Sequence, residues 1–180
     1  MLDEKVIELS KVKIMLIILG AIVFVLLGLW FLSMDAQAIE SQKRFNNPVL
    51  IYGIGIVSVV FFGLCGLVGI KKLFDSSPGL VISSKGILDN SSGMSAGVIP
   101  WKDVAGVGEY QVKKQRFISI LLKDPEKYAN NGNALRIMAN RANIKMCGTP
   151  VSISANSLKI SYEDLLGAIT EYYRKSSENA

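Results

Sequence analysis

The stretch IMLIILGAIVFVLLGLWFL, residues 14–32, has nineteen residues and contains no Asp, Glu, Lys, Arg or His. A second stretch, VLIYGIGIVSVVFFGLCGLVGI at residues 49–70, has twenty-two residues and is equally uncharged. A helix rises about 1.5 Å per residue, so either stretch is long enough to cross a hydrocarbon layer of about 30 Å. The two stretches predict transmembrane helices at residues 14–34 and 48–72, joined by a short extracytoplasmic loop at 35–47.

Two other interpretations of these stretches are less consistent with the sequence. Buried core helices would need to be wrapped by the remaining ~110 residues, which offer too little surface. A cleaved signal peptide is suggested by the small residues of Ala36-Gln37-Ala38, but signal peptides have an apolar region of about 7 to 15 residues. The first stretch is longer than that, and the segment before it carries Asp3, Glu4 and Glu8. We therefore favour a hairpin of two membrane spans.

The positions of lysine and arginine predict the orientation of this hairpin. Cytoplasmic segments of membrane proteins carry an excess of these residues close to the spans. Five lie before the first span or directly after the second, and two lie in the connecting loop: Lys5, Lys11, Lys13, Lys71 and Lys72 against Lys43 and Arg44. We expect a multi-pass protein of the bacterial inner (cell) membrane with both termini in the cytoplasm, the first being a tail at residues 1–13.

The rest of the chain has the pattern of a mixed domain. A turn-rich linker at 73–78 precedes a domain at 79–175 and a tail at 176–180. Short β-branched runs separated by Gly, Asn and Ser are typical of an antiparallel meander. The runs lie at 80–82, 86–88, 98–99, 104–112 and 117–122, with turns at 89–93 and 113–116. A helical segment at 126–146, interrupted at 130–133, follows them, and a strand returns at 151–154.

The last element is an amphipathic helix over residues 162–175. Ser161 followed three residues later by Asp164 matches a capping box, in which short oxygen side chains accept from the free N–H groups of the first turn. Apolar side chains recur on one face, which we expect to pack against the open sheet: Leu165, Leu166, Ile169, Tyr172 and Tyr173.

The meander, the segment Ile99-Pro-Trp-Lys-Asp-Val104 and the terminal helix together resemble the bacterial pleckstrin-homology-like (PH-like) domains. With the two spans, the chain resembles a family of small, functionally uncharacterised bacterial membrane proteins. Further segments carry the likeness: Gly79-Leu-Val-Ile82, Lys85-Gly-Ile87, Asp89-Asn-Ser-Ser92 and Asn156-Ser-Leu158. The resemblance implies an α+β membrane protein, in which two nearly orthogonal antiparallel sheets are closed by the C-terminal helix. It implies no lipid-headgroup site, because the loop at 83–86 has a single lysine.

The composition argues against catalysis. The chain has no histidine and only two cysteines, Cys65 and Cys147, one of which lies within a predicted span. The commonest general base and any zinc cluster are therefore missing, and we expect neither a cofactor nor a metal. Gly106-Val-Gly108 lacks the continuation of a phosphate-binding loop and is interpreted as a strand irregularity. Trp101 is interpreted as a packing residue rather than a ligand platform.

The distribution of charge suggests one candidate binding surface. The net charge of +5 belongs entirely to residues 71–180, which carry fifteen basic and ten acidic side chains. That density is too low for a nucleic-acid partner, but it suits the surface of an anionic leaflet. The basic turn Lys113, Lys114 and Arg116 is the predicted lipid-facing group, with a solvated hairpin tip as the alternative.

Three classes of function remain open from the sequence. The leading hypothesis is a membrane-tethered, non-enzymatic module that binds a protein partner at the inner face of the membrane through a sheet edge or a helix end. The alternatives are a module that contacts anionic lipid or senses membrane stress, and a subunit of an enzyme or transporter. Glycines at i, i+3 and i+6 of the second span, Gly63, Gly66 and Gly69, permit close helix packing against the first span or a second copy.

Overall fold

The computed structural model describes residues 4–93 and 96–178 and divides into two compact units. The first, here called the hairpin unit, is Lys11–Asp75, and the second, the β unit, combines Met1–Ser10 with Ser76–Ala180. Residues 1–3 of the predicted N-terminal tail and 179–180 of the predicted C-terminal tail lie outside the described residues. The chain is a mixed α+β protein with two antiparallel sheets and two long apolar helices.

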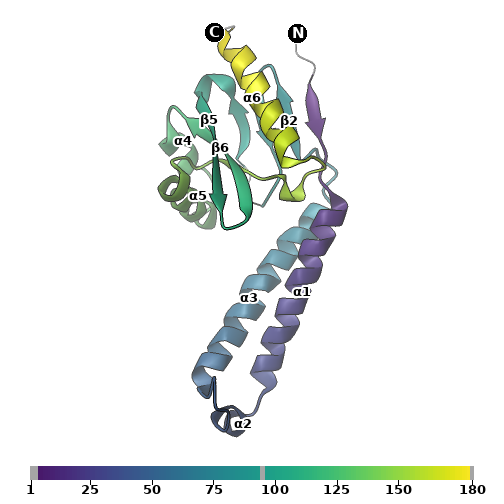
Figure 1. Cartoon of the computed structure of the whole chain (residues 1–180), viewed down its shortest axis with the longest axis vertical. Coiled ribbons are helices and arrows are strands. Elements are labelled where there is room, and N and C mark those ends of the chain that lie inside the picture. The colour runs from purple at the N-terminus through teal and green to yellow at the C-terminus, as the bar shows by residue number, and fades with distance from the viewer. Residues whose placement is uncertain (1–3, 94–95, 179–180) are drawn as a thin grey trace. The chain divides into compact units, whose positions relative to one another are not determined.

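The hairpin unit is built from helices α1 (Lys11–Ser33) and α3 (Pro48–Leu73), joined through the short helix α2 (Ala36–Glu40) (Figure 1). α3 begins where the sequence provides a start signal: Pro48 occupies the first turn and the side chain of Asn47 accepts from the N–H of Leu50 at 3.3 Å. Ala36-Gln37-Ala38, the segment that resembles a cleavage site, lies within α2.

Small residues let α1 and α3 pack closely. The buried positions of α1 are Ile14, Ala21 and Gly28, spaced by seven residues. A Cβ atom added to Gly28 would lie 2.9 Å from the carbonyl oxygen of Gly55 on α3, so only glycine permits this approach. The seven-residue spacing is that of left-handed helix pairs.

The glycines that the sequence singled out have different surroundings. Gly66 and Gly69 face α1, where added Cβ atoms would meet Ala21 at 3.8 Å and Ile18 at 2.8 Å. Gly63 has nothing within 4 Å of such an atom and lies on the outer face of α3. Two of the three predicted glycines are thus used within the chain, although the closest approach involves Gly28 and Gly55.

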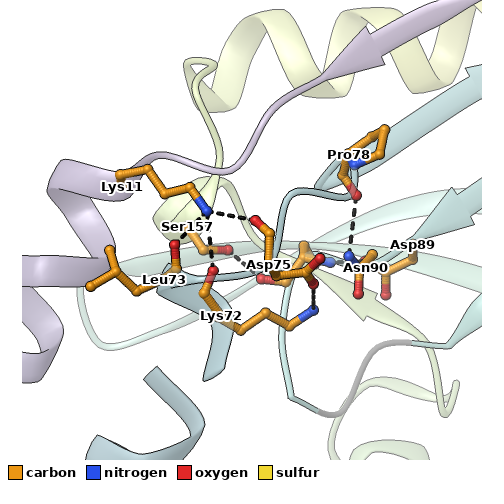
Figure 2. A network of polar contacts seen from close by, with 9 residues as sticks. Lys11, Lys72, Leu73, Asp75, Pro78, Asp89, Asn90 and Ser157 are labelled. Atoms are coloured by element: carbon orange, nitrogen blue, oxygen red, sulfur yellow. Dashed lines mark hydrogen bonds and ion pairs between the residues drawn. The ribbon is translucent and has the colours of Figure 1, made fainter. Parts of the chain in front are cut away.

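A lysine joins the open ends of the two long helices. The amino group of Lys11 donates to the carbonyl oxygens of Leu73 at 2.6 Å and Asp75 at 2.5 Å, where α3 ends (Figure 2). The last carbonyls of a helix lack partners within the helix and carry its partial negative charge. Lys11 therefore satisfies these acceptors and fixes the start of α1 to the end of α3.

The β unit contains two antiparallel sheets. The first has four strands in the order β1-β2-β3-β4, and the second has three in the order β5-β6-β7. The strands of the first sheet are β1 (Lys5–Ile7), β2 (Leu80–Ser83), β3 (Gly86–Asp89) and β4 (Gly97–Pro100). Those of the second are β5 (Val104–Val112), β6 (Gln115–Leu122) and β7 (Ser152–Ile153).

The strand β1 is the main difference from the sequence prediction. Residues 1–13 were expected to be a tail, but Lys5–Ile7 pairs with β2, with Ile7 opposite Leu80 and Lys5 opposite Ile82. The strand and its partner are separated in the sequence by the whole hairpin unit. The first sheet is therefore completed by residues that precede the first long helix.

A one-turn 3-10 helix, η1 (Trp101–Asp103), carries the chain from the first sheet to the second. Trp101 is buried as predicted, and its indole N–H donates to the carbonyl of Ser83 at 2.8 Å. The register of β5 against β6 shifts between Val104 and Gly106, which confirms the predicted irregularity of this segment.

The helical segment that interrupts the second sheet consists of α4 (Pro125–Ala129) and α5 (Ala134–Cys147), separated as predicted by residues 130–133. Another 3-10 helix, η2 (Ala155–Ser157), then leads to the last helix, α6 (Tyr162–Glu178). The capping box is present, because the hydroxyl of Ser161 accepts from the N–H of Asp164 at 3.1 Å.

The core of the β unit lies between the two sheets and α6 (Figure 1). α6 buries Leu165, Ala168, Ile169 and Tyr172. The predicted stripe is confirmed except at its flank, where Leu166 is only half-buried and lies on the outer surface beside Gly167.

Ile169→Ala should lower the free energy of unfolding by about 2 to 5 kcal/mol, because Ile169 is fully buried and the substitution leaves a cavity. Leu166→Ala removes the same number of carbon atoms from the half-buried flank and serves as the matched control, with an expected loss of about 1 kcal/mol or less. Denaturant unfolding of the full chain in mild detergent measures both. Equal losses would contradict the packing of α6.

Candidate functional site

The β unit has one end at which the chain enters and leaves the hairpin, through Ser10 and Ser76. The N–H of Ser10 donates to Ser157 at 2.7 Å, and the hydroxyl of Ser157 donates to the carbonyl of Ser91. The side-chain amide of Asn90 donates to the carbonyl of Pro78 at 3.3 Å (Figure 2). These contacts join four separate segments of the chain into what we call the proximal end of the β unit.

The predicted basic turn lies close to this proximal end. β6 runs antiparallel to β7, so the start of β6 lies beside the residues that follow β7. The side-chain amide of Asn156 donates to Gln115 at 3.2 Å, next to Ser157 of the proximal end. Lys113 and Lys114 form the tip of the β5–β6 hairpin, and both are exposed.

Arg116 is held away from the other two residues of the basic turn. Its guanidinium donates to Glu163 at 2.6 Å and to Glu109 at 3.1 Å. It also lies 3.9 Å from the ring centroid of Tyr162, within the range of a cation–π contact. The structure therefore brings Lys113 and Lys114 together at the tip and pairs Arg116 with two carboxylates.

The same cluster shifts the ionisation of a tyrosine. Partial burial raises the pKa of Tyr162 to about 12, and the hydrogen bond from its hydroxyl to Glu109 at 2.9 Å adds to the shift. Tyr162 stays protonated at physiological pH, so this cluster ties α6 to the β5–β6 hairpin without offering a reactive group.

An open groove of about 580 Å³ lies at the other end of β2 and of α6, which we call the distal end. It is lined by residues of the β2–β3 turn, β4, η1 and the last turns of α6: Ser84, Lys85, Val98, Pro100, Trp101, Lys102, Lys175 and Ser176. The groove therefore combines a sheet edge with a helix end, since β4 is an edge strand of its sheet.

The lining of this distal groove is apolar in its floor and basic at its rim. The side chain of Val98 is 67% exposed, and Trp101 packs beside Tyr173 with ring centroids 6.1 Å apart. Lys85 and Lys102 are exposed, and Lys175 pairs with Glu171 at 2.5 Å. The described lining contains three lysines and no carboxylate, an arrangement that favours an anionic ligand with an apolar part.

The carboxylate of Asp103, in η1, has structural partners. Asp103 accepts from the amino group of Lys127 and from the hydroxyl of Tyr128, both at 2.8 Å. The hydrogen bond from Lys127, followed by that from Tyr128, lowers the pKa of the Asp103 carboxyl. Within residues 4–93 and 96–178, no group of three or more His, Cys, Asp and Glu side chains is placed to hold a metal ion.

No protein-family model matches the chain, and neither a curated protein nor a solved structure matches it.

The sequence singled out Trp101 but missed the groove that it supports. Val98 and Lys85 belong to strand and turn segments whose patterns predict structure without indicating which side chains share a surface. The segment Val98-Ile-Pro-Trp-Lys102 could have indicated the groove. Its proline is typical of an edge strand, and an aromatic and a basic residue follow directly.

Lys113→Gln combined with Lys114→Gln should leave the thermal midpoint of the β unit unchanged, because both side chains are exposed and no carboxylate of residues 4–93 or 96–178 is paired with them. Arg116→Gln should lower the midpoint, since Glu109 and Glu163 would lose their shared cation. Thermal unfolding of the full chain at low and high salt measures both, and the effect of Arg116→Gln should shrink at high salt. A larger effect of the double lysine variant would contradict this assignment.

Proposed function

We propose that the chain is a membrane-tethered, non-enzymatic interaction module, whose distal groove binds an acidic, partly apolar segment of a protein partner at the inner face of the bacterial cell membrane. The observation that carries this proposal is the groove between the β4 edge and the end of α6, with lysines around an apolar floor. In this proposal the hairpin unit anchors the β unit, and with it the groove, to the bilayer.

The exposure of the long helices supports a membrane location. The most apolar windows of α1 and α3 have mean hydropathies of 2.9 and 2.4, and only 17% and 6% of their residues are buried. A core helix of a soluble protein with such composition would be mostly buried. Apolar surface of this extent is unfavourable in water and is accommodated by lipid.

Two independent features support the proposed orientation. β1 lies before the hairpin and pairs with β2 after it, so both ends of a membrane-spanning hairpin emerge on the same side. The five basic residues beside those ends, against two in the α1–α3 connection, favour the cytoplasm for that side.

The strand order supports a PH-like domain. Four strands in one sheet and three in the next, followed by a terminal helix, match the architecture that the sequence resemblance implies. In this assignment the hairpin unit is an insertion between the first two strands, and α4 with α5 is an insertion between the last two. Such domains serve many functions, so the fold supports a binding role only in general terms.

The available side-chain chemistry favours binding over catalysis. The chain has no histidine, and Asp103, Glu109 and Glu163 are each engaged by a basic side chain. The described lining residues of the groove are lysines, serines, a valine, a proline and a buried tryptophan, and none of them carries a carboxylate or a thiol.

The position of the groove determines the kind of partner. The β2–β3 turn with Lys85 lies at the opposite end of β2 from Leu80, the residue that follows the membrane linker. Lys175 lies at the opposite end of α6 from Glu163, which contacts the β5–β6 hairpin. The groove is therefore remote from the attachment points of the hairpin and is open to a partner that arrives from the aqueous phase.

A photo-crosslinking amino acid at Val98, in the full chain in its own membrane, tests this proposal. It should yield one predominant protein adduct, because Val98 lies in the groove and is largely exposed. The variant Lys85→Glu/Lys102→Glu should reduce that adduct about tenfold or more, since each reversed charge removes an attraction and adds a repulsion.

Two matched controls accompany this experiment. The same photoreactive group at Thr170, on the outer face of α6, should not yield the adduct, and Lys123→Glu/Lys159→Glu makes the same charge change on exposed lysines away from the groove. An adduct at Val98 that survives the groove variant, or is equally reduced by the control variant, would contradict the proposal. So would the absence of any specific adduct at Val98.

A further inference from the structure

Helix α5 presents apolar side chains outward. Leu135, Met138 and Met146 are 54%, 64% and 56% exposed. They lie at i, i+3 and i+11, positions that share one face of a helix. Three large apolar side chains on one exposed face are not explained by the packing of the β unit.

The opposite face of α5 explains why the apolar residues are turned outward. Asn140 is buried, and its side-chain amide donates to the carbonyl of Tyr128 at 3.1 Å. Asn143 donates in the same way to Pro150 at 3.4 Å. The inward face of α5, which also carries the half-buried Ile137 and Ile144, is thus fixed to the β unit partly by hydrogen bonds, and the large apolar side chains of Leu135, Met138 and Met146 remain on the outward face.

Basic residues accompany the exposed stripe. Residues 127–162 contain five basic side chains and no acidic one. Two of them, Arg141 and Lys145, lie one and two turns from Met138 and are exposed. An exposed apolar face flanked by basic side chains is the pattern of a helix that lies in a membrane interface and favours anionic lipid.

The place of α5 within the β unit agrees with such a contact. α5 and the loop that joins β5 to β6 lie at the same end of the unit as the segments through which the chain departs (Figure 1). The thiol of Cys147, the last residue of α5, interacts with the hydroxyl of Tyr110, three residues before the tip. The C-terminal end of α5 therefore lies close to the β5–β6 hairpin, in the unit that is tethered to the hairpin unit through Ser10 and Ser76.

We propose that the outward face of α5 binds the surface of the membrane in which the hairpin is anchored. Leu135, Met138 and Met146 enter the headgroup region, and Arg141 and Lys145 contact anionic headgroups together with the exposed Lys113–Lys114 tip. Charge complementarity and the tethered proximal position select this occupant. The inference rests on the membrane anchoring proposed above, and it assigns a surface separate from the distal groove.

Spin labels at single cysteines in the full chain test this assignment, in a background with Cys65→Ala and Cys147→Ala. The purified protein is placed in phosphatidylcholine vesicles with or without added phosphatidylglycerol. Collision of each label with oxygen and with a water-soluble nickel complex then reports whether it lies in lipid. With phosphatidylglycerol present, a label at Met138→Cys should collide more often with oxygen than with the nickel complex. A label at Val98→Cys in the distal groove should collide more often with the nickel complex.

The charged flank provides the second measurement. Arg141→Gln with Lys145→Gln should lower the ratio of docked to undocked α5 about 30-fold, because each basic residue near an anionic surface contributes about 1 kcal/mol to binding. Omitting phosphatidylglycerol should likewise move the Met138 label towards water. Both changes should leave the Val98 label unaffected.

A label at Val57→Cys, on the exposed face of α3, distinguishes a failure of the α5 contact from a failure of the membrane anchoring. Lipid exposure at Val57 with water exposure at Met138 would overturn the α5 contact and leave the anchoring intact. Water exposure at both positions would overturn the anchoring as well. Because the purified system contains no partner protein, protection of Met138 there supports lipid as the occupant.

Discussion

The antiparallel pairing of β1 with β2 is the constraint on which the rest of the molecule depends. Ile7 and Leu80 are opposite one another, although about 70 residues separate them in the sequence. Closing a flexible loop of that length would cost considerable conformational entropy. Here the intervening residues form a packed hairpin whose ends are already joined, because Lys11 binds the carbonyls of Leu73 and Asp75. The two ends of the hairpin unit are therefore held close together.

This pairing divides the β unit into two functional ends. The proximal end collects the segments on either side of the hairpin with the loops around Asn90 and Ser157. The distal end places the β2–β3 turn, the β4 edge and the end of α6 around a groove. α6 runs from the proximal to the distal end and packs against strands of both sheets. Its buried residues Leu165, Ile169 and Tyr172 therefore join the two ends in one packed unit. We propose that one end contacts the bilayer and the other end a partner.

Local sequence signals predicted most of the elements. The runs at 80–82, 86–88, 104–112 and 117–122 each became strands, and Ser161 with Asp164 marked the start of α6. These elements depend on short-range patterns of β-branched residues, turn residues and capping groups, which are visible in a single sequence.

The remaining features depend on contacts between distant residues. β1 is three residues long within a charged segment, and only pairing with β2 makes it a strand. The outward apolar face of α5 was missed because the buried Asn140 and the half-buried Asn143 lie on its inward face, and periodicity cannot tell which face is buried. Arg116 was grouped with its neighbours Lys113 and Lys114, yet its partner Glu163 lies 47 residues further along the chain.

A disulfide measurement tests the central claim that β1 closes the sheet across the hairpin. Val6 and Val81 are opposite one another in the β1–β2 register, so cysteines at these two positions should form a disulfide in intact membranes under mild oxidation, with Cys65 and Cys147 replaced by alanine. Val98 lies in the same row but three strands from Val6, about 14 Å away, and the pair Val6→Cys with Val98→Cys should stay reduced. Equal crosslinking in the two pairs, or none in the first, would contradict the account.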